Sequence, residues 1–190
     1  MSKLYIEDQV FEKVHYLEKP LEKGDYENCT FIHCDFSDAD ISGILFQDCT
    51  FRDCNLSMSK ISNTAFRNVI FKDCKCLGMH FEYCNPFMFS VSFENTNLQM
   101  SSFYQLKIKK TKFKNCKMHE VEFTETDLQG SIFENCDLHA AVFENTIVEK
   151  ADFRNAYNYS IDPEKNYIQK ARFSVAGLPG LLFKYNIDIE

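Results

Sequence analysis

The sequence predicts an all-β solenoid, a four-sided coil in which every five residues form one side. Three observations predict this fold: a large apolar residue recurs at every fifth position, the residue two places before it is small, and charged residues avoid both positions. A period of five matches neither an α-helix, with a period of 3.6 residues, nor a β-strand, with a period of 2. A strict short repeat is typical of solenoids, in which each unit stacks only on its neighbours.

The large apolar residues, which we call centre positions, run almost unbroken through the chain in two frames. Each centre position would place one large side chain in the middle of one side of the coil. In chain order they are Tyr26, Phe31, Phe36, Ile41, Phe46, Phe51, Leu56, Ile61, Phe66 and Phe71, and then Phe93, Leu98, Phe103, Ile108, Phe113, Met118, Phe123, Leu128, Phe133, Leu138, Phe143, Val148 and Phe153.

An insert separates the two frames. The first frame ends near Phe81 and the second begins near Phe93, so twelve residues replace ten. This slip predicts a small bulge or a short loop near residues 82–92. We expect the large side chains of the insert to cover the bulge, and the alternative is that they form an exposed contact loop. These side chains are Phe87, Met88 and Phe89.

The centre position and the position two before it, which we call the small slot, exclude charge. From Cys29 to Phe81 and from Val91 to Phe153 these positions number 48, and none is charged although 26% of the chain is. Random placement would put roughly a dozen charges there, and an unpaired charge is costly inside a protein. We therefore expect both positions to point inward, as for Phe133, and the other three to face water, as for Asp127.

Four sides of five residues make one full turn, and this longer period is visible in the second half of the chain. Phe recurs once per turn in two columns with aliphatic columns between them, so we expect Phe to fill two opposite sides. Asn also recurs once per turn and tolerates the conformations of a corner. The columns are Phe93, Phe113, Phe133, Phe153 and Phe173, then Phe103, Phe123 and Phe143, and the asparagines are Asn95, Asn115, Asn135 and Asn155.

This pattern resembles the pentapeptide repeat family, whose loose consensus is A-(D/N)-L-x-x. Good matches begin at Ala39, Cys54, Cys136 and Ala151. The resemblance covers roughly Asp25 to Ser174 and implies a right-handed quadrilateral β-helix. With it we divide the chain into an N-terminal cap, a pentapeptide-repeat β-helix, and a C-terminal helix with a dimerisation tail. These parts are residues 1–25, residues 26–174 with the interruption near 82–92, and residues 175–190.

The nine cysteines suggest a metal site at first sight, because the spacing of Cys29, Cys34, Cys49 and Cys54 is similar to that of a four-thiolate zinc site. However, eight of the nine occupy the small slot, where cysteine alternates with Ala, Ser, Thr and Val. Only Cys76 occupies a centre position. We therefore expect buried free thiols that act as small apolar side chains, with no metal ion and no cofactor.

Nothing in the chain indicates catalysis or a membrane location. The five histidines are scattered, no Ser/His/Asp or Cys/His set can be built, and the six glycines form no phosphate-binding loop. We expect no catalytic residue. The net charge is −7, and the chain has neither a long apolar run nor a signal peptide. These features favour a cytoplasmic protein that does not bind membranes.

The C-terminal tail leaves the repeat and carries an apolar cluster. Ser174 is placed to cap a short helix over the residues that follow. The tail from Ile161 to Leu182 resembles that of the Qnr quinolone-resistance and microcin immunity type of the pentapeptide repeat family. The resemblance implies a homodimer formed through the C-terminus. The candidate dimer contacts are Leu178, Leu181, Leu182, Phe183 and Ile187.

An acidic belt lies in the second half of the coil, where residues 118–149 contain eight acids and no Lys or Arg. Members of the Qnr type are proposed to imitate DNA and to occupy the DNA-binding saddle of type II topoisomerases. The resemblance therefore implies DNA gyrase or topoisomerase IV as partner, without direct binding of nucleic acid. The candidate partner-binding residues are Glu120, Glu122, Glu125, Asp127, Glu134, Asp137, Glu144 and Glu149.

A general protein-interaction scaffold without topoisomerase activity is the alternative. The long projecting loops that matter for drug protection in many Qnr proteins are absent from this sequence. A basic stretch also lies beside the acidic belt, and it could bind an acidic partner instead. Its residues are Lys107, Lys109, Lys110, Lys112, Lys114 and Lys117.

Overall fold

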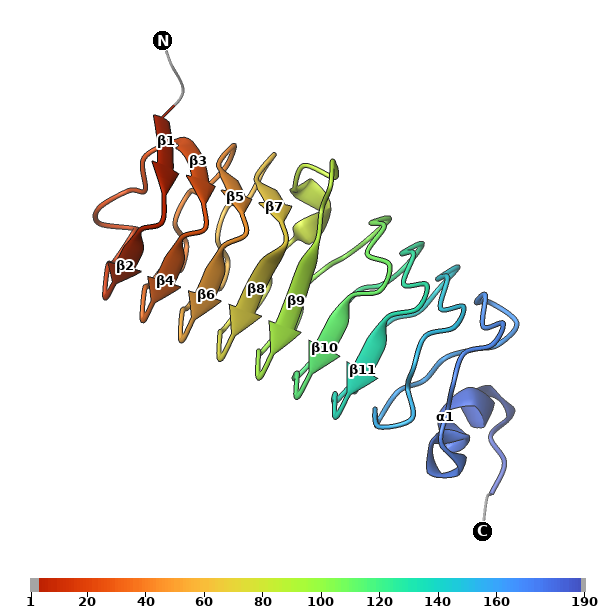
Figure 1. Cartoon of the computed structure of the whole chain (residues 1–190). Coiled ribbons are helices and arrows are strands. Elements are labelled where there is room, and N and C mark those ends of the chain that lie inside the picture. Colours follow the sequence, from red (N-terminus) through yellow and green to blue (C-terminus); the bar gives the residue numbers. More distant parts are fainter. Residues whose placement is uncertain (1–3, 189–190) are drawn as a thin grey trace.

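Residues one turn apart in the sequence lie one above another in the coil. The structure, a computed structural model that describes residues 4–188, pairs Tyr26 with Phe46 and Asp35 with Asn55 in parallel register. The turns stack into a right-handed four-sided rod, with the N-terminal turn at one end and the C-terminal helix at the other (Figure 1). The predicted solenoid is confirmed.

The β-strands occupy two adjacent sides of the coil, and each strand is short because a corner follows within five residues. Side 1 carries a four-stranded parallel sheet and side 2 a seven-stranded parallel sheet (Figure 1). Side 1 contains β1 (Leu4–Glu7), β3 (Gly24–Glu27), β5 (Leu45–Gln47) and β7 (Ala65–Arg67), and side 2 contains β2 (Val10–Glu12), β4 (Thr30–Ile32), β6 (Thr50–Arg52), β8 (Val69–Lys72), β9 (Val91–Glu94), β10 (Lys112–Lys114) and β11 (Ile132–Glu134).

Sides 3 and 4 complete each turn through isolated parallel bridges rather than strands. Such bridges join Lys117 to Asp137 on side 3 and Ser102 to Glu122 on side 4. Side 1 continues beyond β7 in the same way, through the bridge from Lys107 to Asp127. The centre positions of side 3 include Phe36, Leu56, Leu98, Met118 and Leu138, and those of side 4 include Ile41, Ile61, Phe81, Phe103, Phe123 and Phe143.

The corners place the residue two after a centre position in the left-handed region. On side 3, for example, the Ala39 N–H donates to the Phe36 carbonyl at 2.9 Å, and Asp38 has a φ of 57°. This is the arrangement of a type II turn, which requires a positive φ at its third residue. Asn is expected there because it tolerates this conformation. Of the four asparagines predicted at corners, Asn95, Asn115 and Asn135 have a positive φ, and Asn155 does not.

The two inward positions form the core. All 48 of them, from Cys29 to Phe81 and from Val91 to Phe153, are buried, as the exclusion of charge predicts. Phe113 and Phe133 are fully buried, and their rings stack at 5.0 Å with planes 12° apart. Apolar burial on this scale is the main stabilising contribution to the coil.

Phe fills opposite sides 2 and 4 in the second half of the coil, as predicted. Stacked rings follow side 2 from Phe93 to Phe173 and side 4 from Phe81 to Phe143. In the first half the second aromatic column lies on side 1 instead, and it ends at Phe66. The aromatic column therefore changes side at the insert.

Residues 4–25 follow the repeat, although the sequence interpretation placed them outside it. Parallel pairing joins β1 to β3 and β2 to β4. Gln9 and Lys19 occupy the small slot, which holds small uncharged residues elsewhere in the coil. The five-residue period is therefore hard to recognise in this part of the sequence. The centre positions of this first turn are Ile6, Phe11, Tyr16 and Leu21.

The insert shifts the stacking register. Phe51 pairs with Phe71, which is one regular turn later, whereas Phe71 pairs with Phe93, so that the turn between them is longer by two residues. A short 3-10 turn, η1 (Phe81–Tyr83), precedes the extra residues. The predicted slip of two residues is confirmed.

The side chains of the insert divide between core and solvent. Phe89 packs against the rings of Phe66 and Phe81, with centroids 6.4 Å and 6.3 Å away, and so covers the bulge as expected. Phe87 and Met88 are exposed, contrary to that expectation. Phe87 instead lies under the guanidinium of Arg67, 5.3 Å from the ring centroid.

The C-terminal tail forms the predicted short helix in three pieces. Ser174 caps the first piece, because its hydroxyl accepts a hydrogen bond from the Gly177 N–H at 3.1 Å. The pieces are η2 (Val175–Gly177), α1 (Pro179–Leu182) and η3 (Phe183–Tyr185). Within the described residues no helix is long and apolar enough to cross a membrane.

Candidate functional site

Acidic and amide side chains directly before a centre position cap the turns of the coil. Asp127 accepts a hydrogen bond from the Gln129 N–H at 3.1 Å, Asp137 from the His139 N–H at 3.3 Å, and Glu122 from the Thr124 N–H at 2.7 Å. For Asp127 and Asp137 this bond forms an Asx turn, and the longer Glu122 side chain makes the equivalent bond. Three of the eight candidate acids therefore stabilise the coil itself.

Asp127 differs most from its prediction, since we expected it to face water and it is only 9% exposed. It lies on the outer surface of side 1, but the Lys109 ammonium covers it at 3.1 Å and Gln129 lies beside it. The outward direction of its slot is correct, and the neighbouring side chains bury it. Asp127 is thus a poor candidate for binding a partner.

Asp137 is held in a small polar cluster on side 3. The His119 Nε2 atom lies 2.7 Å from one of its carboxylate oxygens, and the Asn158 amide donates to the other at 2.8 Å. Partial burial alone would raise the pKa of Asp137, but the hydrogen bonds from His119 and Asn158 outweigh it and hold this pKa below the usual value.

The other five candidate acids do not cap turns, and they project from the outer surface. Glu144 forms a salt bridge with Lys165 at 2.9 Å. Within residues 4–188 the remaining four have no salt bridge, and two of them accept hydrogen bonds only from glutamines, Gln105 and Gln129. The four stand on four different sides of the coil, since Glu120 is on side 3, Glu125 on side 4, Glu134 on side 2 and Glu149 on side 1.

The basic stretch also contains both paired and unpaired residues. Lys109 pairs with Asp127 at 3.1 Å, and Lys114 pairs with Glu94 at 3.3 Å. The other four lysines form no salt bridge within the described part of the chain. They are Lys107, Lys110, Lys112 and Lys117, and they lie on sides 1, 2 and 3.

The cysteines are free and buried, and those in the small slot make a bond that the sequence analysis did not foresee. Seven of these thiols donate to a carbonyl one turn below, as Cys54 does to the Phe31 carbonyl at 3.4 Å. Thr126 makes the same bond through its hydroxyl, to the Phe103 carbonyl at 2.8 Å. The slot therefore favours small side chains that can donate a hydrogen bond, rather than small apolar ones alone.

The thiols of Cys49 and Cys76 are poorly suited to binding a metal ion. Burial raises the pKa of Cys49 to about 12 and that of Cys76 well above its usual value, and metals bind the thiolate form. No group of three His, Cys, Asp or Glu side chains between residues 4 and 188 is arranged to hold a metal ion.

The candidate dimer contacts face in two directions. Leu181 packs against the core of the coil, and Leu182 is half-buried. Leu178, Phe183 and Ile187 are exposed. Val175 and Tyr185 are also exposed in the tail, and the sequence analysis did not identify them. It assumed one helix, whereas the tail forms three short helical pieces, which turn different side chains toward solvent.

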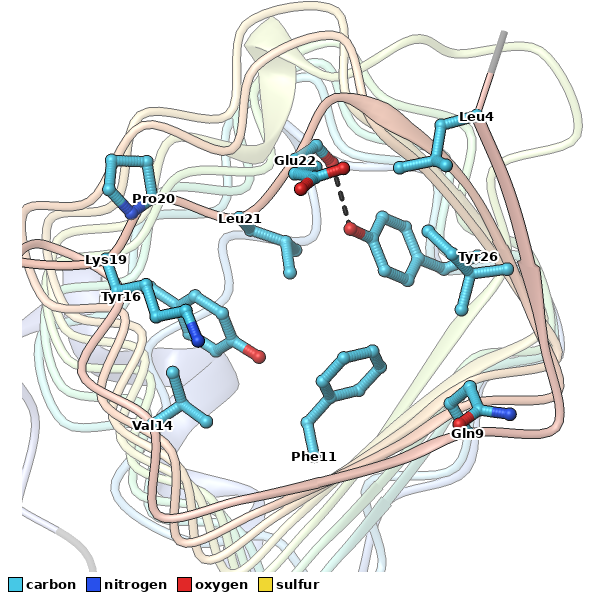
Figure 2. A pocket seen from close by; sticks show the side chains of 11 residues that line it. Leu4, Gln9, Phe11, Val14, Tyr16, Lys19, Pro20, Leu21, Glu22 and Tyr26 are labelled. Carbon is cyan, nitrogen blue, oxygen red and sulfur yellow. Dashed lines mark hydrogen bonds between the residues drawn. The ribbon is translucent and has the colours of Figure 1, made fainter.

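A cavity of about 390 Å³ opens at the N-terminal end of the coil, and the sequence analysis did not predict it. Figure 2 shows aromatic and aliphatic side chains pointing into it from all four sides. The Tyr26 hydroxyl is tied back to the Glu22 carbonyl at 2.9 Å. The only signal for this cavity is the open end that a solenoid leaves at its first turn. Its apolar lining includes Phe11, Val14, Tyr16, Leu21 and Tyr26.

Comparisons with known proteins agree with this geometry. The family described as "Pentapeptide repeat region" matches residues 25–103 and 86–157. A trypsin-treated variant of QnrB1, described as a plasmid-mediated fluoroquinolone resistance protein, is 18% identical with a TM-score of 0.65, covering 98% of this chain and 100% of that one. A second trypsin-treated variant of QnrB1 is 19% identical with a TM-score of 0.59, and the match covers 98% of this chain and 92% of that one. No curated protein matches the chain. The chain belongs to the pentapeptide repeat family.

Proposed function

We propose that this protein is a non-enzymatic mimic of DNA that binds and modulates a type II topoisomerase such as DNA gyrase or topoisomerase IV. One observation carries the proposal: four glutamates project from four sides of a narrow rod, and no cation among residues 4–188 forms a salt bridge with them. They are Glu120, Glu125, Glu134 and Glu149. The other half of the acidic belt caps turns or is paired.

The charge density of these four glutamates is comparable with that of DNA. Residues 120–149 span about one and a half turns, which is a rise of about 7 Å at the spacing of paired strands. A duplex of that length carries about four phosphate charges. The similarity in fold to QnrB1, which is described as a fluoroquinolone resistance protein, supports a partner of this class.

A homodimer formed through the C-terminal tail completes the proposal. Leu178, Phe183 and Ile187 are exposed at one end of the rod, and a symmetric contact between two copies would bury them. The two rods would then extend in opposite directions from the contact. The acidic belts of both copies would form one longer charged surface.

A binding experiment tests the role of the glutamates. We expect DNA gyrase to bind the protein in dilute salt and the affinity to fall at least about tenfold as salt is raised, because screening weakens exposed charge pairs. The double variant Glu120→Lys, Glu134→Lys should bind more weakly at every salt concentration. Glu18→Lys, an exposed change near the N-terminal end, is the matched control and should bind like the parent. Equal binding by all three proteins would refute the proposal.

The basic stretch supports a second candidate function, a scaffold that binds an acidic protein surface. Lys107, Lys110, Lys112 and Lys117 form no salt bridge within the described residues, so their charges are available. This candidate predicts that the protein is retained on an acidic resin and that Lys107→Glu with Lys110→Glu abolishes retention. Gyrase binding that is lost with the glutamate variant and kept with the lysine variant would favour the first function.

A further inference from the structure

Columns of stacked rings run through the coil and reach its N-terminal end. Phe11 lies on Phe31 with ring centroids 4.8 Å apart and planes 10° apart. The next pair, Phe31 on Phe51, has the same centroid distance and the same angle between planes. Tyr16 lies on Phe36 at 4.3 Å. One face of the Phe11 ring and one face of the Tyr16 ring therefore contact the ring below. The opposite face of the Phe11 ring borders the N-terminal cavity (Figure 2), and Tyr16, which is only 4% exposed, also lines the cavity.

The walls of this cavity are mainly apolar, although Gln9, Lys19 and Glu22 also line it. Val14, Pro20, Leu21 and Tyr26 line it beside the two rings, and its volume of about 390 Å³ is that of a pocket for a small molecule. Leu21 and Tyr26 are themselves buried, so the cavity is recessed below the rim of the first turn. A molecule must enter the cavity rather than lie across it.

One buried polar group in the lining has no hydrogen-bond partner among the described residues. The Tyr16 hydroxyl is buried, points toward the middle of the opening in Figure 2, and forms no hydrogen bond with the described residues. A buried hydroxyl without a partner is costly. Burial also raises the pKa of Tyr16, which keeps the hydroxyl neutral and able to donate.

We propose that the N-terminal cavity binds a small planar aromatic molecule that carries a hydroxyl or carbonyl group. Its ring would continue the column on side 2 by stacking on Phe11, and its oxygen would accept a hydrogen bond from the Tyr16 hydroxyl. A second copy of the chain is the other possible occupant. It fits less well, because two rims that meet would enclose the recessed cavities without filling them, and such cavities are destabilising.

Calorimetric titration with 2-naphthol tests the proposal, and decahydro-2-naphthol is the matched probe because it keeps the hydroxyl and the carbon skeleton but is not planar. We expect one 2-naphthol per chain, bound at least about tenfold more tightly than the saturated probe because only a flat ring stacks on Phe11. No saturable binding of 2-naphthol up to its solubility, or equal binding of the two probes, would overturn the proposal.

Variants locate the site. Val14→Phe should fill the cavity and reduce the affinity at least about tenfold, and Tyr16→Phe should reduce it about fivefold by removing the hydrogen-bond donor. Phe173→Leu, at the other end of the same ring column, should leave it unchanged. If thermal unfolding shows that Val14→Phe does not fold, Phe11→Leu replaces it, with an expected loss of about fivefold.

Two results would contradict the assignment of the site. The first is a folded Val14→Phe or Phe11→Leu protein that binds 2-naphthol like the parent. The second is self-association in sedimentation that Val14→Phe abolishes, in a protein that does not bind 2-naphthol. That second result would assign the cavity to another copy of the chain.

Discussion

Gly180 and Tyr159 approach so closely that a Cβ atom on Gly180 would lie 2.3 Å from the Tyr159 carbonyl oxygen. The same contact is reinforced by the Ile161 N–H, which donates to the Gly180 carbonyl at 2.9 Å. Tyr159 also packs its ring 5.9 Å from that of Phe153, the last fully buried ring of its column. The backbone of the tail is therefore docked directly on the end of the coil.

Gly180→Ala should displace the tail from the coil. The carbonyl oxygen belongs to the backbone and cannot move alone, so we expect a loss of about 1–3 kcal/mol in the free energy of unfolding. Denaturant unfolding measures this change. Val175→Ala is the control, because that side chain is 86% exposed and its loss should change stability by less than about 0.5 kcal/mol. Equal stability of Gly180→Ala and the parent would show that the tail is not docked this way.

The hydrogen bond made from the small slot can be tested with a reciprocal pair of variants. Thr126→Val keeps the shape of the side chain but removes the bond to the Phe103 carbonyl, and we expect it to cost about 1 kcal/mol. Val121→Thr introduces a hydroxyl at another fully buried small slot, and we expect no loss of stability or a small gain. Both are measured by urea unfolding. A destabilised Val121→Thr together with a neutral Thr126→Val would mean that the slot selects for size alone.

Acid should weaken the cluster around Asp137. Its pKa in the folded protein is below the usual value of 3.8, so the ionised carboxylate contributes stability above pH 3.8, and that contribution is lost as the pH falls through the folded pKa. At pH 7 we expect Asp137→Asn to be about 1 kcal/mol less stable than the parent, because a charge-assisted bond to His119 is lost.

The stability difference between Asp137→Asn and the parent should shrink toward zero well below pH 3.8. Thermal unfolding at pH 7 and at about pH 2, together with an NMR titration of the carboxyl group, checks both statements. A titration midpoint above 3.8 would contradict them.

The fold could be predicted from the sequence because burial excludes charge so strictly. An uncharged slot every five residues places Phe113 and Phe133 inside the coil without any knowledge of contacts. The same argument failed at residues 4–25, where Gln9 and Lys19 occupy inward slots. Among the described residues no turn lies above the first one, and its inward slots border an open cavity in which polar side chains can reach solvent.

The candidate site could be predicted only in part. The position of a residue in the five-residue repeat fixes the direction of its side chain, but it does not show which other side chains lie beside it. The outward slot of Asp127 was correct, but the sequence does not show that Lys109, from the turn below, would cover it. Turn capping was available as a signal, since Asp127 and Asp137 both directly precede a centre position. Acids directly before a centre position, such as Asp137, cap turns, whereas acids at other outward positions, such as Glu134, do not.

Supercoiling by purified DNA gyrase is the measurement that tests the proposed function most directly. Titration of the protein into the reaction, with and without a quinolone, should change the yield of supercoiled DNA, either by inhibition or by rescue from the drug. The effect should fade as salt is raised and should be lost in the Glu120→Lys, Glu134→Lys variant. An unchanged yield over a wide range of protein concentration, in both arms of the experiment, would contradict the account.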